Sequence, residues 1–314
     1  MDIRHRHVAV APVLALLLNA FVWGVSWWPF RRLHDAGLHP LWATTVVYAL
    51  SAVVIAVWRP RSLRQLATSP ALWLICVASG STNATFNWAV SVGDVVRVVL
   101  LFYLMPLWAL LLARLVLKER LTRGAFLRLG LALGGAALVL SQGAPPEGGG
   151  AGAHAGHGRV LGALTLPDLL AVIGGFAFAL NTVMLRREAA RPEEGRALAM
   201  FVGGVVVAGA AAVTLSAGGG GAAAPVAWPS GAGGWALPAF VLALAFMASN
   251  LCLQYGAARL PATATAVVMP SEVLFAALTA VWWGDATLHW SVLAGGALIL
   301  SAALASAIES NGDH

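Results

Sequence analysis

Charged side chains are scarce in this chain of 314 residues. Only 10% of the residues are Asp, Glu, Lys or Arg, whereas 60% are apolar, and the mean hydropathy is +0.82. A soluble domain carries about 25% charged residues, because its surface has to stay hydrated. The shortage of charge therefore excludes an ordinary soluble fold.

Cysteine and nucleotide-binding motifs are also scarce or absent. Cys76 and Cys252 both lie inside apolar runs, where they are interpreted as packing residues and not as a disulfide or a metal pair. The sequence has no P-loop motif, so ATP hydrolysis is not expected to drive the protein. The net charge of +6 does not indicate nucleic acid, because the basic residues lie in short loops between apolar runs. We expect no cofactor and no metal.

Long apolar runs dominate the sequence instead. A helix needs about 20 mostly apolar residues to cross a membrane. Ten segments meet this requirement, at residues 9–29, 38–58, 70–91, 95–117, 124–142, 166–185, 197–217, 235–256, 261–283 and 288–308. The sequence therefore predicts an all-α integral membrane protein with ten transmembrane helices.

One longer connection divides the chain. Residues 143–165 are rich in Gly, Ala and Pro, which is typical of a flexible linker. This linker contains His154 and His157, which are interpreted as solvated loop residues and not as metal ligands. We expect a first unit at 1–142, a periplasmic linker at 143–165, a second unit at 166–308 and a cytoplasmic tail at 309–314.

The basic residues indicate the orientation. If the N-terminus is cytoplasmic, fourteen of the nineteen Lys and Arg residues fall on the cytoplasmic side. Only Arg31, Arg32 and Arg159 fall outside, and Arg97 and Arg114 lie near or within the spans. Because cytoplasmic loops are enriched in Lys and Arg, we expect both termini on the cytoplasmic side of a bacterial inner membrane.

Two patterns recur along the chain. Phe21–Ser26 corresponds to Phe176–Asn181 at an offset of 155 residues, and an Arg pair follows each copy. Met105-Pro106 and a later Gly-Gly pair recur at Met269-Pro270 and Gly295-Gly296. Each copy holds five predicted helices. Because five is odd, the second copy enters the membrane from the opposite side and is inverted relative to the first. Inverted repeats are common in secondary transporters, although a duplication kept only for stability is the alternative.

Polar residues inside the spans are candidates for a binding site, because they are expensive in hydrocarbon. Asn83 and Asn87 share a helix face, and Asn250 and Gln254 have the same spacing in the corresponding span. They line a site across the pseudo-axis or form interhelical hydrogen bonds, and the sequence leaves both interpretations open. Asn181 corresponds to Ser26 in the repeat and is expected to hydrogen-bond across the bundle.

Glu272 is the only acidic residue deep in a span. It is a candidate for binding a substrate amine, for carrying a coupling proton or for pairing with a buried Arg. Trp23, Trp88 and Tyr103 are candidate walls of the cavity, with packing as the alternative. Arg97 either attracts a substrate carboxylate or pairs with Asp94.

Proline occurs at matching positions in two spans. Pro106 and Pro270 each remove a backbone donor and favour a kink. We expect these kinks to take part in gating.

Together these motifs resemble the EamA-type members of the drug/metabolite transporter superfamily. The resemblance rests on Phe21–Trp27 (FVWGVSW), on Leu101–Ser141 and on Leu260–Ser301. It implies ten helices, a central cavity that opens to one side at a time, and the transport of amino acids and other small metabolites, often outward. The second half departs from the family pattern, with Asp285 in place of the usual Glu.

The sequence thus predicts a secondary transporter, not an enzyme, which exports small metabolites such as amino acids across the inner membrane by alternating access. Its partners would be a small-molecule substrate and the lipid bilayer. A channel or a non-transporting scaffold is the alternative, and a lipid enzyme is less favoured because the acidic and His residues are scattered. Substrate, direction, coupling ion and a homodimeric state stay open.

Overall fold

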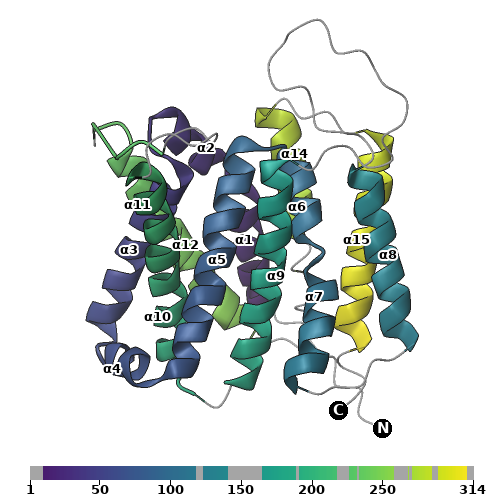
Figure 1. Cartoon of the computed structure of the whole chain (residues 1–314), viewed down its shortest axis with the longest axis horizontal. Helices are drawn as coiled ribbons and strands as arrows, with labels where there is room; N and C mark the ends of the chain where they lie inside the picture. Colours follow the sequence, from purple (N-terminus) through teal and green to yellow (C-terminus); the bar gives the residue numbers. More distant parts are fainter. Residues whose placement is uncertain are drawn as a thin grey trace, which may run out of the picture.

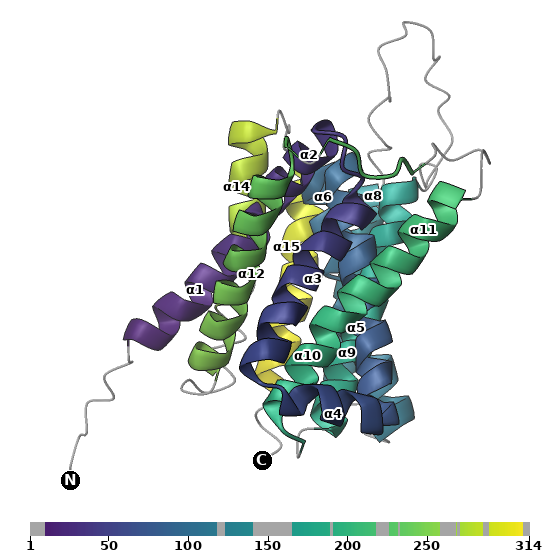
Figure 2. The ribbon, with the colours of Figure 1, turned by 90° about the vertical axis from the view of Figure 1, so that its left-hand side faces the viewer.

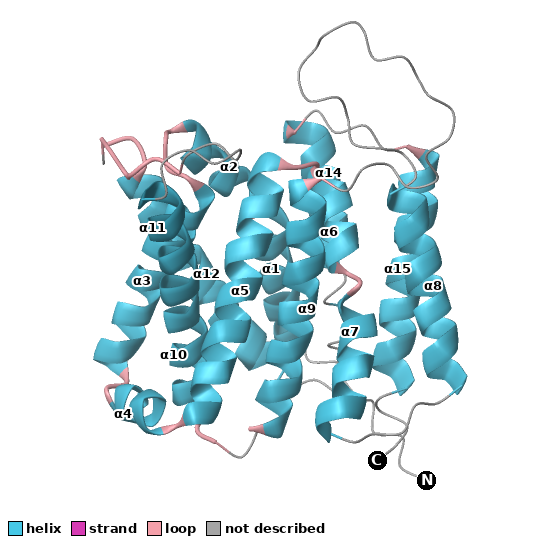
Figure 3. Ribbon diagram, viewed as in Figure 1, coloured by secondary structure: helices cyan, strands magenta, loops and turns pink. Residues whose placement is uncertain are grey.

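The computed structural model describes residues 10–117, 123–140, 165–188, 191–217, 226–231, 233–257, 268, 271–284 and 289–309. All regular secondary structure within these ranges is helical, as the uniform cyan of Figure 3 shows. The helices run side by side along one direction and form a bundle (Figure 1). The predicted all-α class is therefore confirmed for the described residues. The linker at 143–164 and the tail beyond residue 309 lie outside them.

Within the described residues, the first half of the chain contains eight helices and one π-helical turn. They are α1 Val10–Val25, α2 Trp27–Asp35, α3 Pro40–Trp58, α4 Arg61–Thr68, α5 Pro70–Val92, α6 Val95–Phe102, α7 Met105–Leu112, the π turn Ala113–Leu117 and α8 Arg123–Leu140. The second half contains α9 Leu166–Arg187, α10 Glu193–Gly203, the π turn Gly204–Ala208, α11 Gly209–Ala217, α12 Ala236–Ala257, α14 Ser271–Trp283 and α15 Trp290–Glu309.

Six helical stretches are long and apolar enough to cross a membrane, and they identify a multi-pass membrane protein. They are Val10–Asp35, Pro40–Trp58, Val95–Val116, Leu166–Leu185, Glu193–Ala217 and Ala236–Leu253. Large apolar side chains also cover the outside of the bundle, among them Val57, Trp282 and Trp290, which are 77%, 72% and 81% exposed. A soluble protein rarely exposes so much apolar surface, whereas a bilayer favours it.

Each of the ten predicted segments contains helix, but the boundaries differ. The first helix is extended by α2 to Asp35, because the Phe30 amide donates to the Ser26 carbonyl and helical hydrogen bonding continues across the junction. The short helix α4 was not predicted. It follows Pro60, buries Ser62 and Leu66, and lies against α10.

Helix α5 is the polar centre of the bundle. It packs against α9, α10, α3 and α2, and Figure 1 shows it between α10 and α9. It buries fourteen of its side chains, among them Ser79, Thr82, Asn83 and Asn87. Such polar content lowers its hydropathy, so α5 is not among the six apolar stretches above, although its 23 residues are long enough to cross a membrane.

The helix contacts are paired between the two halves. Helix α1 packs against α12 and α14, and the corresponding contacts are α9 with α5 and with α6 and α7. Helices α8 and α15 pack against each other. If α1, α5, α6 with α7, and α8 of the first half are matched with α9, α12, α14 and α15 of the second, exchanging the matched helices reproduces these contacts.

The first helices of the two halves run in opposite directions. Helix α1 leads into α2 at one end of the bundle, and α9 begins at that same end, beside α6 (Figures 1 and 2). We call this the α2 end. Helix α4 lies at the opposite end, which we call the α4 end (Figure 2).

Candidate functional site

A break interrupts the helix that contains Pro106. Helix α6 ends at Phe102, Tyr103 and Leu104 form a turn, and α7 begins at Met105. Pro106 has no N–H to donate to the Phe102 carbonyl four residues earlier. That carbonyl lies against Gly175 of α9, where a Cβ would come within 2.6 Å of its oxygen. The helix is thus interrupted next to Pro106, where the sequence predicts a kink, and the role of this position in gating stays a prediction. The side chain of Pro106 and all of Pro270 lie outside what the structure describes.

The break brings two predicted site residues together. The Tyr103 hydroxyl forms a side-chain hydrogen bond with the Glu272 carboxyl group. Glu272 lies in the first turn of α14 and is partly buried, and Tyr103 is only 3% exposed. The backbone of α1 is close at this point, because a Cβ on Gly24 would lie 2.6 Å from the Glu272 carbonyl oxygen.

A second polar group joins α5 to α3. The Tyr48 hydroxyl donates to Asn83 Oδ1 at 2.5 Å, and Asn83 Nδ2 donates to the Ser79 carbonyl at 2.8 Å. Asn87 Nδ2 donates to Thr44 Oγ1 at 3.1 Å. The predicted amide pair therefore forms interhelical hydrogen bonds with α3, and neither amide bonds to Asn250.

Three buried asparagines retain an unsatisfied acceptor. Asn19, Asn87 and Asn181 are 1%, 0% and 4% exposed, and the Oδ1 atom of each has no hydrogen-bond partner among the described residues. The hydrogen bond across the bundle that the sequence predicts for Asn181 stays a prediction. An unsatisfied buried acceptor is costly in an apolar interior, so these oxygens are available to a donor.

The predicted aromatic walls are separated. Trp23 of α1 stacks on Phe246 of α12, with ring centroids 4.7 Å apart. Trp88 of α5 meets His39 edge-on, with centroids 5.2 Å apart. Trp88 packs against the same core cluster as Tyr103, whereas Trp23 packs against a different one, so the three rings do not form a single wall.

A cavity of about 200 Å³ opens between α3, α10 and α12 at the α4 end. Asn250, another predicted site residue, contributes to its lining together with Trp58, Arg59, Glu193, Glu194 and Phe201. The cavity thus carries groups of both charge signs beside aromatic rings. The side chain of Gln254 lies outside what the structure describes.

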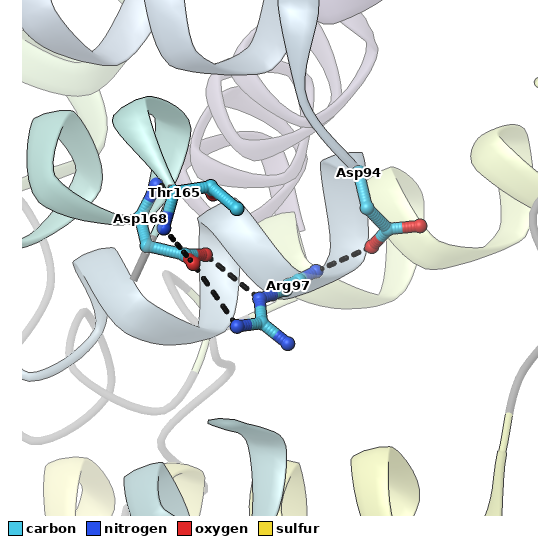
Figure 4. Close-up of polar contacts among 4 residues, drawn as sticks. All are labelled: Asp94, Arg97, Thr165 and Asp168. Carbon is cyan, nitrogen blue, oxygen red and sulfur yellow. Dashed lines mark hydrogen bonds and ion pairs between the residues drawn. The ribbon is translucent and has the colours of Figure 1, made fainter. Parts of the chain in front are cut away.

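The α2 end is closed by a buried ion pair. The Arg97 guanidinium donates to both carboxylate oxygens of Asp168, at 2.7 and 3.0 Å, and the two residues are 7% and 1% exposed (Figure 4). The Thr165 amide also donates to Asp168, at 3.0 Å. Asp94 accepts from the backbone amide of Arg97 at 2.7 Å and so caps α6 (Figure 4). The ion pair joins α6 of the first half to α9 of the second.

A further contact seals the same end. Arg31 of α2 donates to the Gly93 carbonyl at 2.9 Å, at the C-terminus of α5. A cation placed there compensates the unpaired carbonyls at a helix end. Among the described residues, the α2 end therefore holds a buried ion pair and a capped helix, whereas the α4 end holds the cavity beside Asn250.

Several of these polar residues were not predicted from the sequence. Thr44 and Tyr48 are four residues apart in one span, which is the same spacing as in Asn83 and Asn87, and this signal was available. Asn19 donates to Ser249 Oγ at 2.7 Å between α1 and α12. Asp168 follows the linker directly, and nothing in its local sequence distinguishes it from a helix-capping acid. Within the described residues, no three His, Cys, Asp or Glu side chains gather as metal ligands would.

Comparisons with known proteins agree with this architecture. Residues 10–141 match the EamA-like transporter family. A solved structure, known only as the crystal structure of a protein, is similar over 96% of this chain and 97% of its own, with 15% sequence identity and a TM-score of 0.55. That similarity concerns the fold alone. No curated protein matches the sequence.

Proposed function

Because residues 10–141 form an EamA-like transporter domain, we propose that this chain is a secondary transporter that moves small metabolites across the membrane by alternating access. The contrast between the two ends is the observation that carries the proposal. The α2 end is closed by Arg97 and Asp168, and the α4 end holds the cavity beside Asn250. A closed end opposite a hollow end is what one state of an alternating-access cycle requires.

The paired contacts support two inverted units of five helices, and the two units together account for ten membrane crossings. Helix α1 runs toward the α2 end and α9 begins there, so the halves are antiparallel. In this proposal the α4 end is cytoplasmic, because Arg59, Arg61, Arg64 and Arg196 lie there. The structure then represents the state open to the cytoplasm.

The proposed pathway leads from the cavity toward Tyr103 and Glu272. The break between α6 and α7 is the proposed gate, with Pro106 in the first half and Pro270 in the second. The unsatisfied oxygens of Asn87 and Asn181 offer acceptors to a solute, and Trp23 and Trp88 support the walls. Amino acids, exported from the cytoplasm, are the solutes that the family resemblance favours.

A thermal-shift screen of the purified protein against amino acids and related metabolites tests this proposal. A ligand present at about 100 times its Kd stabilises the fold by about 2.7 kcal/mol, so a true substrate raises the melting temperature. Stabilisation by tryptophan or phenylalanine identifies an aromatic amino acid as the solute. The Asn250→Ala variant is expected to show a smaller shift, because its side chain lines the entrance. No shift with any metabolite class would count against a metabolite site.

A further inference from the structure

The carboxyl group of Glu272 has no basic partner among the described residues. Its polar side-chain contact is the Tyr103 hydroxyl, a neutral donor. Another buried acid of the bundle, Asp168, receives two hydrogen bonds from Arg97 and one from Thr165. An unpaired acid inside a membrane protein is energetically costly, and acids kept at such positions commonly have a function.

The helices packed against α14 provide no counter-charge for Glu272. Helix α1 carries no ionisable side chain, and the one such residue on α6, Arg97, is paired with Asp168. The charged residues of α2 lie near the opposite end of α14, where Trp27 Nε1 donates to Thr279 at 3.0 Å and Trp28 packs on Trp283. These charged residues are Arg31, Arg32, His34 and Asp35.

A purely structural role does not explain why this position is an acid. At three places the interhelical hydrogen bonds use neutral amides, those of Asn19, Asn83 and Asn87, whereas the buried acid Asp168 is paired with Arg97. An amide at position 272 would equally accept a hydrogen bond from Tyr103 without the cost of a charge. What the carboxylate adds is the ability to bind one positive charge and to release it.

Building on the transport function proposed above, we propose that Glu272 and Tyr103 form a site for one exchangeable positive charge, bound either as a proton or as the ammonium group of a solute. A proton converts the carboxylate to a neutral acid, and an ammonium ion forms an ion pair with it, so the two compete. The Tyr103 hydroxyl lies on the break between α6 and α7. A movement of the break therefore changes the number of donors at the carboxylate and couples the gate to the bound charge.

Labelling of the wild-type protein with dicyclohexylcarbodiimide tests the site without any substitution. A protonated carboxyl group adds across a C=N bond of this apolar reagent, and the adduct is located by mass spectrometry. We expect an adduct on Glu272 whose yield falls as the pH rises from 5.5 to 8.5, by about tenfold per pH unit above the titration midpoint. If n-butylammonium lowers the yield and n-butanol does not, the site also takes an ammonium group. A pH effect without an effect of the amine identifies a proton site.

Labelling of Glu272 that is absent, or constant across this pH range, would overturn the proposal. Variants provide a second readout through the pH dependence of the unfolding midpoint. Glu272→Gln is expected to remove the change in unfolding midpoint that comes from protonation of Glu272. Tyr103→Phe is expected to keep this change but to move it to a different pH. Asp35→Asn, an exposed acid away from the site, is the matched control and is expected to retain it.

The outcome for transport is separable. Saturable flux through the wild type, together with no labelling of Glu272, would overturn the charge site and leave the transporter intact. A labelled, titrating Glu272 in a protein without flux would support the site and contradict the transport function.

Discussion

At the scale of single residues, buried polar groups determine which helices are held together. The pair of Arg97 and Asp168 is the strongest case, because both residues are buried and belong to different halves of the chain. Removing one partner from a buried pair leaves a charge without compensation, whereas replacing both by apolar residues is often neutral.

We therefore expect Asp168→Asn to destabilise the protein by about 3 kcal/mol, and the double variant with Arg97→Met and Asp168→Leu to recover most of that loss. Unfolding midpoints in detergent measure both effects. Arg187→Gln is the control, because its pair with Glu188 is at the surface and the Arg187 side chain is 58% exposed. Equal destabilisation by Asp168→Asn and Arg187→Gln would show that the α2 end is not held by this pair.

His39 gives the protein a specific pH dependence. Burial, assisted by the charge of His34, lowers the pKa of His39 from 6.5 to about 4. As the pH falls below about 6.5, the unfolded chain takes up a proton that folded His39 does not, so the free energy of unfolding decreases until about pH 4. His39 also caps α3, because its Nδ1 accepts from the Leu41 amide.

His39→Ser is expected to keep the cap and to flatten this part of the pH profile. Unfolding midpoints between pH 4 and pH 7, compared with those of the wild type, measure the difference. Identical profiles for the two proteins would show that His39 titrates normally in the folded state.

At the scale of helices, glycine determines how closely neighbours approach. Gly80 of α5 and Gly203 of α10 face each other closely. A Cβ on Gly80 would collide with the Gly203 carbonyl oxygen, and a Cβ on Gly203 would collide with the Cys76 carbonyl oxygen of α5. Gly134 of α8 has nothing within 4 Å of the position of its Cβ. The two sites are a matched pair, since both glycines lie within helices.

Gly80→Ala is expected to force α5 away from α10 and to cost about 1–3 kcal/mol, as overpacked cores do. Gly134→Ala is expected to be neutral or to stabilise α8 by up to about 1 kcal/mol, because alanine favours helix. Unfolding midpoints of the two variants provide the test. A stable Gly80→Ala protein would show that the two helices have room to separate.

Much of the helical arrangement follows from the sequence, because apolar runs of about 20 residues have few alternatives in a membrane. The short helix α4 did not follow, since eight residues with five polar or basic side chains near Pro60 resemble a loop. The site residues followed only partly. Glu272 and Tyr103 meet because the helix is interrupted between Phe102 and Met105. Asn83 pairs with Tyr48 because of the way α3 and α5 are rotated about their axes. Such long-range juxtapositions are set by packing, which a single sequence does not display.

At the scale of the whole molecule, the account predicts which end faces the cytoplasm. In a background with Cys76 and Cys252 replaced, Arg61→Cys probes the α4 end and Asp35→Cys probes the α2 end, and both positions are exposed. We expect a membrane-impermeant thiol reagent added to intact cells to label the cysteine at position 35 and not the one at position 61. Permeabilised cells, in which both are accessible, are the control. The reverse pattern would invert the proposed orientation.

The central claim is that a closed α2 end and a hollow α4 end are two parts of one transport cycle. Counterflow of labelled amino acids in proteoliposomes tests it most directly, because only an alternating carrier exchanges solute with a rate that saturates. We expect saturable counterflow through the wild type and its loss in Glu272→Gln. A flux that rises linearly with solute concentration would contradict alternating access, whereas saturable counterflow that Glu272→Gln leaves unchanged would contradict only the charge site.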